Sequence, residues 1–255
     1  MKKICTLLLC IGLTFSLAAC SSKNSEEKAY DALEKTLEAT EKMKSGNYEA
    51  TVDMTTDKDS ETQTFSMEGG MISDKENTQF SGVLNVMLEK QNVTFGSLYL
   101  KDKTLYLSIP MIGMNQKMPM ETMLDSATTS SSTKLTTDLL KPWIKKISLS
   151  GNDISISLDT EKLNKLMKSD NDTATSSLLE RMSGSSLSKI DLVITTKDNM
   201  MQKIVADMKM TTTTSDGAKT SNMKMTFEYK NVNKVTSLDF PDNLDSYESS
   251  ESAQK

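Results

Sequence analysis

Tyr48-Glu49-Ala50-Thr51-Val52-Asp53-Met54-Thr55-Thr56-Asp57 alternates apolar or small residues with polar ones along its whole length. Successive side chains of a strand point to opposite faces of a sheet, so a period of two predicts a strand that is buried on one face. The same alternation recurs at residues 65–71, 80–88, 98–107, 154–158, 190–194, 204–210 and 223–229. The sequence therefore predicts roughly nine long antiparallel strands, each apolar on one side only.

A helix and two tight turns frame these strands. Residues 26–45 place four apolar residues on one helical face, namely Tyr30, Leu33, Leu37 and Met43. Gly46 follows in the position of a C-terminal cap. Lys101-Asp102-Lys103 and Lys197-Asp198-Asn199 each separate two alternating runs and predict hairpins.

The middle of the chain is less regular. Residues 111–123 are rich in methionine and residues 127–137 are rich in Ser and Thr, so we expect loops in both. Short helices are predicted at residues 138–147, where Asp138 would be the cap, at 160–167 with Thr160 as the cap, and at 178–182.

These patterns predict the α+β class with a curved antiparallel sheet. One long helix and a few short ones are little cover for a sheet of this width. The sheet is therefore expected to form a half-open β-barrel, with helices packed on the concave face or forming a lid over it.

The N-terminus carries an export signal. Lys2 and Lys3 precede an apolar run, and Leu17-Ala18-Ala19-Cys20 resembles the bacterial lipobox, in which the cysteine receives acyl chains such as palmitate and becomes the mature N-terminus. We thus expect a signal peptide at 1–19, a flexible tether at 20–27, a single domain at 28–245 and a disordered tail at 246–255. Lipidation of Cys20 would place the protein at the cell membrane, on its extracytoplasmic face.

Composition argues against most chemistry. The formal net charge is −5 and the sequence holds no histidine, which disfavours nucleic-acid binding, a zinc site and Ser-His-Asp catalysis. We expect no catalytic residue, no metal site and no cofactor, and so no enzyme. One alternative stays open: closely spaced thioethers at 111–123 are the ligand type that Cu(I) prefers.

The order of elements resembles the LolA/LppX-type lipoprotein carriers, especially uncharacterised Gram-positive lipoproteins of that fold. The resemblance rests on the helix that leads into a long strand, on both hairpins, and on the closing run Asn231-Val232-Asn233-Lys234-Val235. It implies a half-barrel that holds a lipid or another hydrophobic small molecule. The expected function is a carrier, chaperone or sensor at the cell envelope, with an unknown envelope protein as a further partner. The alternative is a structural or protein-interaction lipoprotein whose core is filled and takes no ligand.

Two sets of residues are candidates for ligand contact. The first would line the apolar face: Leu84, Val86, Leu88, Leu105, Leu107, Ile204, Met208, Met210, Met223, Met225 and Phe227. The second would form a gate in the middle segment: Met111, Met114, Met118, Met120 and Met123.

Overall fold

Twelve strands form one sheet in the computed structural model, which describes residues 22–57, 62–73, 77–88, 91–119, 136–168, 185–214 and 217–249. The strand order is β12-β6-β5-β4-β3-β2-β1-β11-β10-β9-β8-β7. Their bounds are β1 (Ser45–Thr56), β2 (Thr62–Ile72), β3 (Gln79–Leu88), β4 (Gln91–Lys101), β5 (Thr104–Ile109), β6 (Met114–Pro119), β7 (Ile144–Ser150), β8 (Asp153–Leu158), β9 (Ser185–Lys197), β10 (Met200–Thr214), β11 (Gly217–Lys230) and β12 (Glu248–Ser249).

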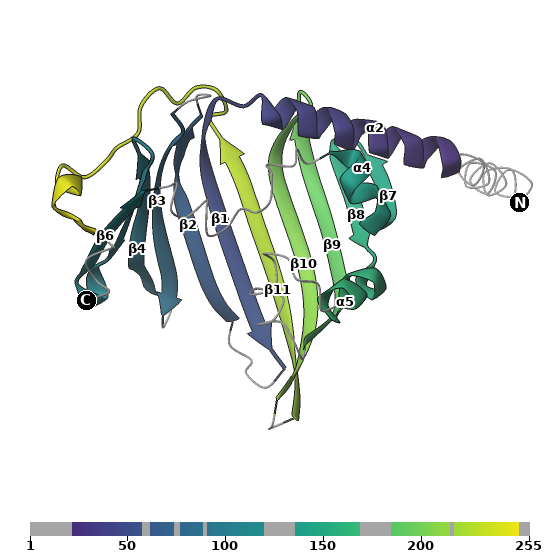
Figure 1. The fold of residues 1–255 in the computed structure, drawn as a ribbon. Coiled ribbons are helices and arrows are strands. Elements are labelled where there is room, and N and C mark those ends of the chain that lie inside the picture. The colour runs from purple at the N-terminus through teal and green to yellow at the C-terminus, as the bar shows by residue number, and fades with distance from the viewer. Residues whose placement is uncertain are drawn as a thin grey trace, which may run out of the picture.

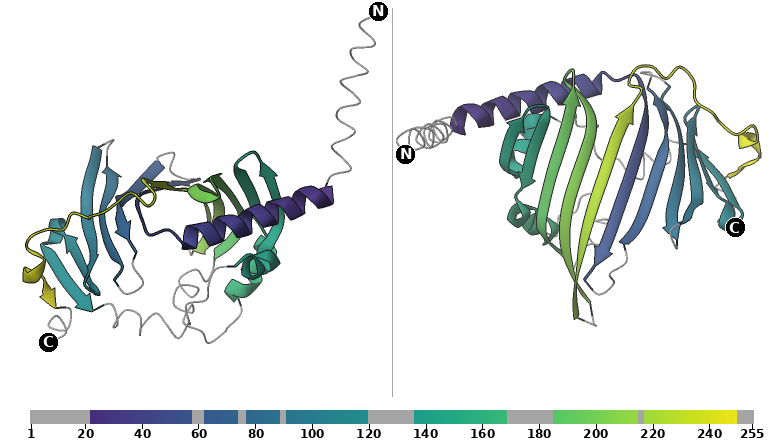
Figure 2. Two further views of the ribbon diagram at one scale, coloured as in Figure 1. Left: turned by 90° about the horizontal axis from the view of Figure 1, so that it is seen from above. Right: turned by 180° about the vertical axis from the view of Figure 1, so that it is seen from behind.

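Strand β1 joins two meanders at the middle of the sheet. It pairs antiparallel with β2 on one side and with β11 on the other. Every other pairing is antiparallel as well, except that of the edge strand β12 with β6, which is parallel. The sheet curves into an open half-barrel whose two edges stand apart (Figures 1 and 2). This confirms the predicted fold class.

Both predicted hairpins are present. Asp102 and Lys103 link β4 to β5 with positive φ values of 50° and 57°, and Asp198 and Asn199 link β9 to β10 with 53° and 60°. A two-residue turn with positive φ at both positions twists in the same sense as the flanking strands. These turns therefore set the register of the two hairpins.

Helix α2 (Ser22–Glu41) starts four residues before the predicted helix and ends four residues before its predicted end. The start lies within the segment 20–27 that was expected to be a flexible tether. At the C-terminal end of the helix, the backbone N–H groups of Lys42 and Met43 donate hydrogen bonds to the carbonyls of Ala39 and Thr40. Gly46 belongs to β1 and is not a cap, so that prediction was wrong. Met43 is buried just outside the helix.

The middle segment differs from the prediction in two places. The expected helix at 138–147 is limited to α4 (Thr137–Leu140) and the 3₁₀ turn η2 (Lys141–Trp143), while Ile144 and Ile147 belong to β7. Helix α5 (Thr160–Lys168) is present as predicted, but Asp159, rather than Thr160, accepts the N–H of Lys162 at 3.2 Å. This bond lowers the pKa of the Asp159 carboxyl. The predicted helix at 178–182 lies outside the described residues.

The methionine-rich loop is largely a strand. Residues 110–112 form the 3₁₀ turn η1 (Pro110–Ile112), and Met114–Pro119 is β6, paired with β5. The expected loop was therefore wrong at residues 114–119.

The C-terminal segment, residues 235–249, runs along the far end of the sheet. It includes the 3₁₀ turn η3 (Leu244–Ser246) and ends in β12. Tyr247 is buried and Glu248 pairs with Gln116. Residues 246–249 thus differ from the expectation of a disordered tail.

Candidate functional site

A continuous apolar face runs across the sheet. Directly opposed residues of antiparallel strands carry their side chains on the same face. From β4 to β7, one row of opposed residues is apolar on every strand: Val93, Val86, Phe65, Val52, Met225, Ala206, Leu192, Ile156 and Ile147. We call the face that carries this row the concave face, because helix α2 lies on it inside the curve of the sheet (Figure 2).

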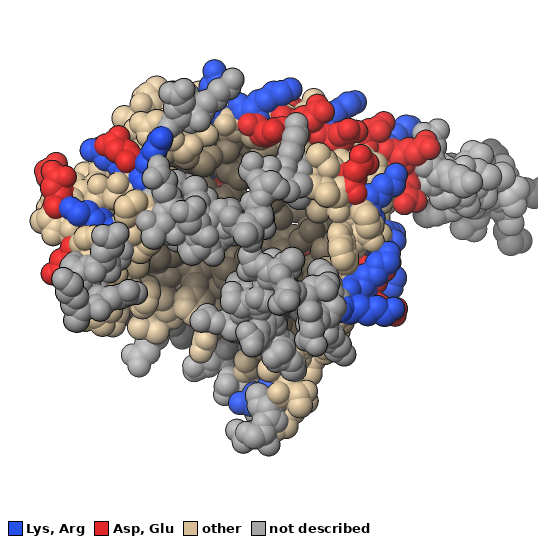
Figure 3. Space-filling view, viewed as in Figure 1, with Lys and Arg blue, Asp and Glu red and all other residues tan. Residues whose placement is uncertain are grey.

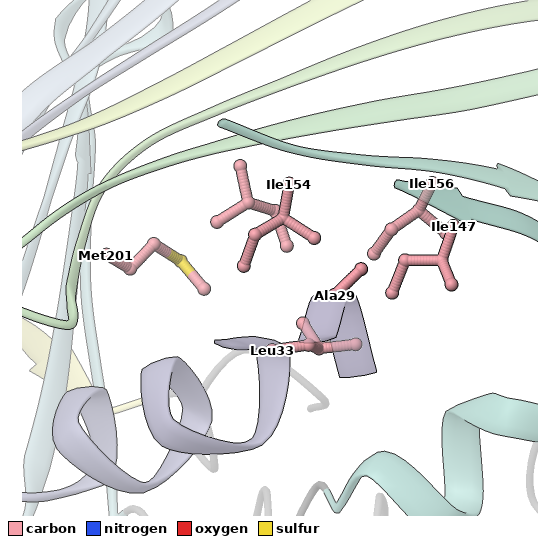
Figure 4. Close-up of a cluster of buried hydrophobic side chains, with 7 residues drawn as sticks. Ala29, Leu33, Ile147, Ile154, Ile156 and Met201 are labelled. Carbon is pink, nitrogen blue, oxygen red and sulfur yellow. The ribbon is translucent and has the colours of Figure 1, made fainter. Parts of the chain in front are cut away.

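Helix α2 covers one end of the concave face. Ala29 and Leu33 are fully buried and pack against Ile147, Ile154 and Ile156 of β7 and β8 (Figure 4). At the other end of the helix, the backbone N–H of Met201 on β10 donates a hydrogen bond to the Thr40 hydroxyl oxygen at 3.3 Å. The described helices therefore pack mainly on β7 to β10.

The rest of the concave face, over β1 to β6 and most of β11, remains partly accessible. Phe65 and Met225 are each 41% exposed, and Leu88 is 51% exposed. Figure 3 looks onto this side: recessed, uncharged surface lies inside a rim on which charged side chains gather, most densely along α2. Water in contact with so many apolar groups is unfavourable, so this area is a candidate binding surface.

Every residue of the first predicted set lies on the concave face. Strand register places Leu84, Val86 and Leu88 on β3, Leu105 and Leu107 on β5, Ile204, Met208 and Met210 on β10, and Met223, Met225 and Phe227 on β11. Most are half-buried, with Leu88 and Met225 exposed. Their role in ligand contact stays a prediction.

The three gate residues that the structure describes lie on two neighbouring elements, and their role as a gate stays a prediction. Met114 and Met118 are half-buried on β6, opposite Ile109 and Leu105, whereas Met111 is 68% exposed in η1. Met120 and Met123 lie outside the described residues, as does Cys20.

Several residues of this face were missing from the predicted set although their alternation was visible, among them Val52, Phe65 and Met67. Val52 opposes Phe65, and Met67 opposes Leu84, so they share the surface with the predicted residues. The signal that would have found them is the cross-strand register, which the sequence pattern alone does not supply.

An aromatic cluster stands at the middle of the concave face. The ring of Tyr48 stacks on Phe80 at 5.1 Å and on Phe227 at 6.1 Å, and its hydroxyl donates to the Ser81 carbonyl at 3.2 Å. Burial raises the pKa of the Tyr48 phenol far above its ordinary value, and it also raises that of Tyr229, which packs against Phe227 at 4.6 Å. Both phenols are therefore neutral at physiological pH and act as apolar surface with a polar tip.

The opposite face of the sheet is polar and is partly covered by the C-terminal segment. Tyr99 meets Phe240 edge to face at 6.3 Å, Tyr106 meets Tyr247 at 5.7 Å, and Ser81 donates to the Asp239 carbonyl. A cavity of about 460 Å³ lies between this segment and the central strands, with Glu49, Glu68 and Lys230 in its wall. Lys230 pairs with Glu49, which raises the pKa of the lysine.

Within the described residues, no group of three or more His, Cys, Asp or Glu residues is placed to hold a metal ion. No helix of the part that the structure describes is long and apolar enough to cross a membrane.

Solved structures with a similar arrangement include three from bacteria. LprF from Mycobacterium bovis is 13% identical with a TM-score of 0.41, over 85% of this chain and 98% of that one. A DUF1329 family protein from Desulfovibrio piger is 8% identical with a TM-score of 0.32, over 84% and 95%. A putative outer membrane lipoprotein-sorting protein domain from Vibrio parahaemolyticus is 9% identical with a TM-score of 0.30, over 88% and 97%.

These neighbours include the lipoprotein-sorting type of domain that the sequence resemblance names, while closeness to Gram-positive lipoproteins stays a prediction. A comparison with curated proteins gives no match. The model of DUF6612, a family of unknown function, matches residues 28–247, and the chain therefore belongs to this family.

Proposed function

We propose that the protein is a non-enzymatic lipoprotein of the cell envelope that binds a lipid or another hydrophobic molecule on the uncovered part of its concave face. The observation that carries this proposal is the apolar row from Val93 to Ile147, of which α2 covers the β7 to β10 end. Burying exposed apolar surface stabilises by roughly 25 cal/mol per Å², so a ligand that filled this area would bind without any specific polar contact.

The way the chain covers its two faces supports the proposal. At the β2 to β6 end, residues 235–249 pack on the polar face and leave the apolar face without a described covering element. A protein that needed only to bury its apolar surface would place this segment on the other side of the sheet. The apolar area that no described element covers is therefore better explained by an occupant than by packing.

Photo-crosslinking of a fatty acid tests the proposal. The full chain in detergent micelles is incubated with a diazirine-labelled fatty acid, irradiated and mapped by mass spectrometry. Label is expected on peptides of β1 to β3 and β11, at concave-face residues such as Phe65 and Met225. Phe65→Lys places a charge on that face and is expected to reduce labelling severalfold.

Ser66→Lys is the matched control. Ser66 is the next residue of β2 and lies on the opposite face, between Thr51 and Asn85, so its substitution is expected to leave labelling unchanged. Equal labelling of both faces, or equal labelling of both variants, would contradict a binding site on the concave face. No labelling above background would favour the ligand-free structural module instead.

The anchor is a separate part of the proposal. Cys20 follows Leu17-Ala18-Ala19 in the lipobox pattern, and two or more acyl chains give stable attachment to a membrane. We expect mass spectrometry of the mature protein to find an acylated N-terminal Cys20, and Cys20→Ala to abolish the added mass. An unmodified cysteine in membrane-derived protein would be evidence against lipidation.

A further inference from the structure

Three methionines occupy one cross-strand row of the concave face. Met54 of β1 is directly opposite Met223 of β11, and Met223 is directly opposite Met208 of β10. Met223 thus has a methionine on each side. The row continues into Gln63 on β2 and Ile190 on β9.

The spacing lets the side chains of Met54 and Met208 reach toward Met223 from either side. Directly opposed residues have Cβ atoms about 4.5–5.5 Å apart, and an unbranched thioether side chain can lean by several ångströms across that distance. The sheet curves around the concave face (Figure 2), and on the inner side of such a curve side chains of neighbouring strands lie closer together than on the outer side. All three methionines are half-buried, so solvent still reaches them.

The surroundings of the row contain little that would compete for a soft ion. The charged residues next to these methionines in sequence are Asp53, Asp207, Lys209 and Lys224, and they lie in the adjacent rows, whose side chains point to the other face. On the concave face the flanking positions are Val52 and Thr56 of β1, Ala206 and Met210 of β10, and Ser221 and Met225 of β11. The donors that the row and its flanking positions offer on this face are therefore uncharged, and thioethers are the commonest among them.

We propose that Met54, Met208 and Met223 form a binding site for a soft monovalent metal ion of the Cu(I) type. Thioether sulfur selects Cu(I), whereas zinc and the hard cations take thiolate, imidazole or carboxylate ligands. This inference goes beyond the proposed function and does not depend on it. It also differs from a copper site in residues 111–123, because the register brings together methionines from three separate strands.

Silver(I) titration of the full chain in detergent micelles tests the site, because silver(I) is a soft monovalent ion that does not change its oxidation state. Met54→Leu/Met208→Leu/Met223→Leu is expected to weaken silver binding about tenfold or more. Leucine preserves the side-chain volume, so this variant is expected to fold like the parent, which its denaturation curve checks. Among single variants, Met223→Leu should weaken silver binding most, because Met223 belongs to both opposed pairs.

Met71→Leu/Met114→Leu/Met118→Leu is the matched control, since it removes three methionines of the same face that lie outside the row. It is expected to bind silver as the parent does. X-ray absorption of the Cu(I)-loaded parent should show a shell of sulfur neighbours that is reduced in the row variant. Equal loss in the two triple variants, or no binding by the parent, would overturn the proposal.

Discussion

Gly69 and Gly82 are directly opposed on β2 and β3, and the ring of Tyr48 lies across them. A Cβ atom added at Gly82 would come closer to the Tyr48 hydroxyl oxygen than the 3.0 Å below which such contacts essentially never occur. The ring is held between Phe80 and Phe227 and by its bond to Ser81, so it cannot move aside without cost. We expect Gly82→Ala to lower the free energy of unfolding by about 1–3 kcal/mol in urea denaturation.

Gly46→Ala is the control for Gly82→Ala. Gly46 is also a buried strand glycine, but the nearest atom to an added Cβ is 3.5 Å away. Its free energy of unfolding is expected to change by less than about 1 kcal/mol, because alanine also reduces the entropy of the unfolded chain. If both substitutions lower the free energy of unfolding by the same amount, the contact with Tyr48 is not what excludes a side chain at Gly82. The sequence shows the two glycines but does not show that they face one tyrosine.

Helix α2 stabilises one end of the sheet. Leu33 is fully buried against β7 and β8, and truncation of such a side chain typically costs about 2–5 kcal/mol (Figure 4). We expect Leu33→Ala to accelerate hydrogen exchange of the amides in β7 and β8, while those of β4 and β5 keep their protection. Glu34→Ala, at an exposed position of the same helix, should change neither region. Uniform loss of protection would mean that the sheet opens as one unit.

At the scale of elements, the sequence predicts the long strands and both hairpins, because alternation over many residues is a strong signal. It fails at β6 and β7, two short strands near Pro119 and Pro142, of which β7 is an edge of the sheet and β6 lies next to the two-residue strand β12. There the local pattern favours a loop or a helix, and the strand forms because β5 and β8 supply paired backbone groups. The candidate ligand face was predictable as a set of apolar residues, but the order of strands that makes it continuous was not.

In the whole molecule, the two ends of the sheet are covered on opposite faces. Helix α2 packs on the concave face over β7 to β10, whereas residues 235–249 pack on the polar face over β2 to β6 (Figures 1 and 2). Each end therefore has a single described covering layer. We expect the β2 to β6 end to depend on the C-terminal segment for its packing, and no described element covers its apolar face.

A chain that ends after Lys234 tests this dependence. It loses the contacts of Phe240 with Tyr99 and of Tyr247 with Tyr106, the bond from Lys117 to the Asp245 carbonyl, and the β12 pairing that covers the edge of β6. We expect limited proteolysis to cut this chain within β4 to β6 faster than the full chain, because an uncovered edge strand opens more readily. A chain that ends after Ser249 keeps all four contacts and should resist cleavage as the full chain does. Equal resistance of the two truncated chains would mean that β2 to β6 are held by their own pairing, and that the C-terminal segment is not part of the folded unit.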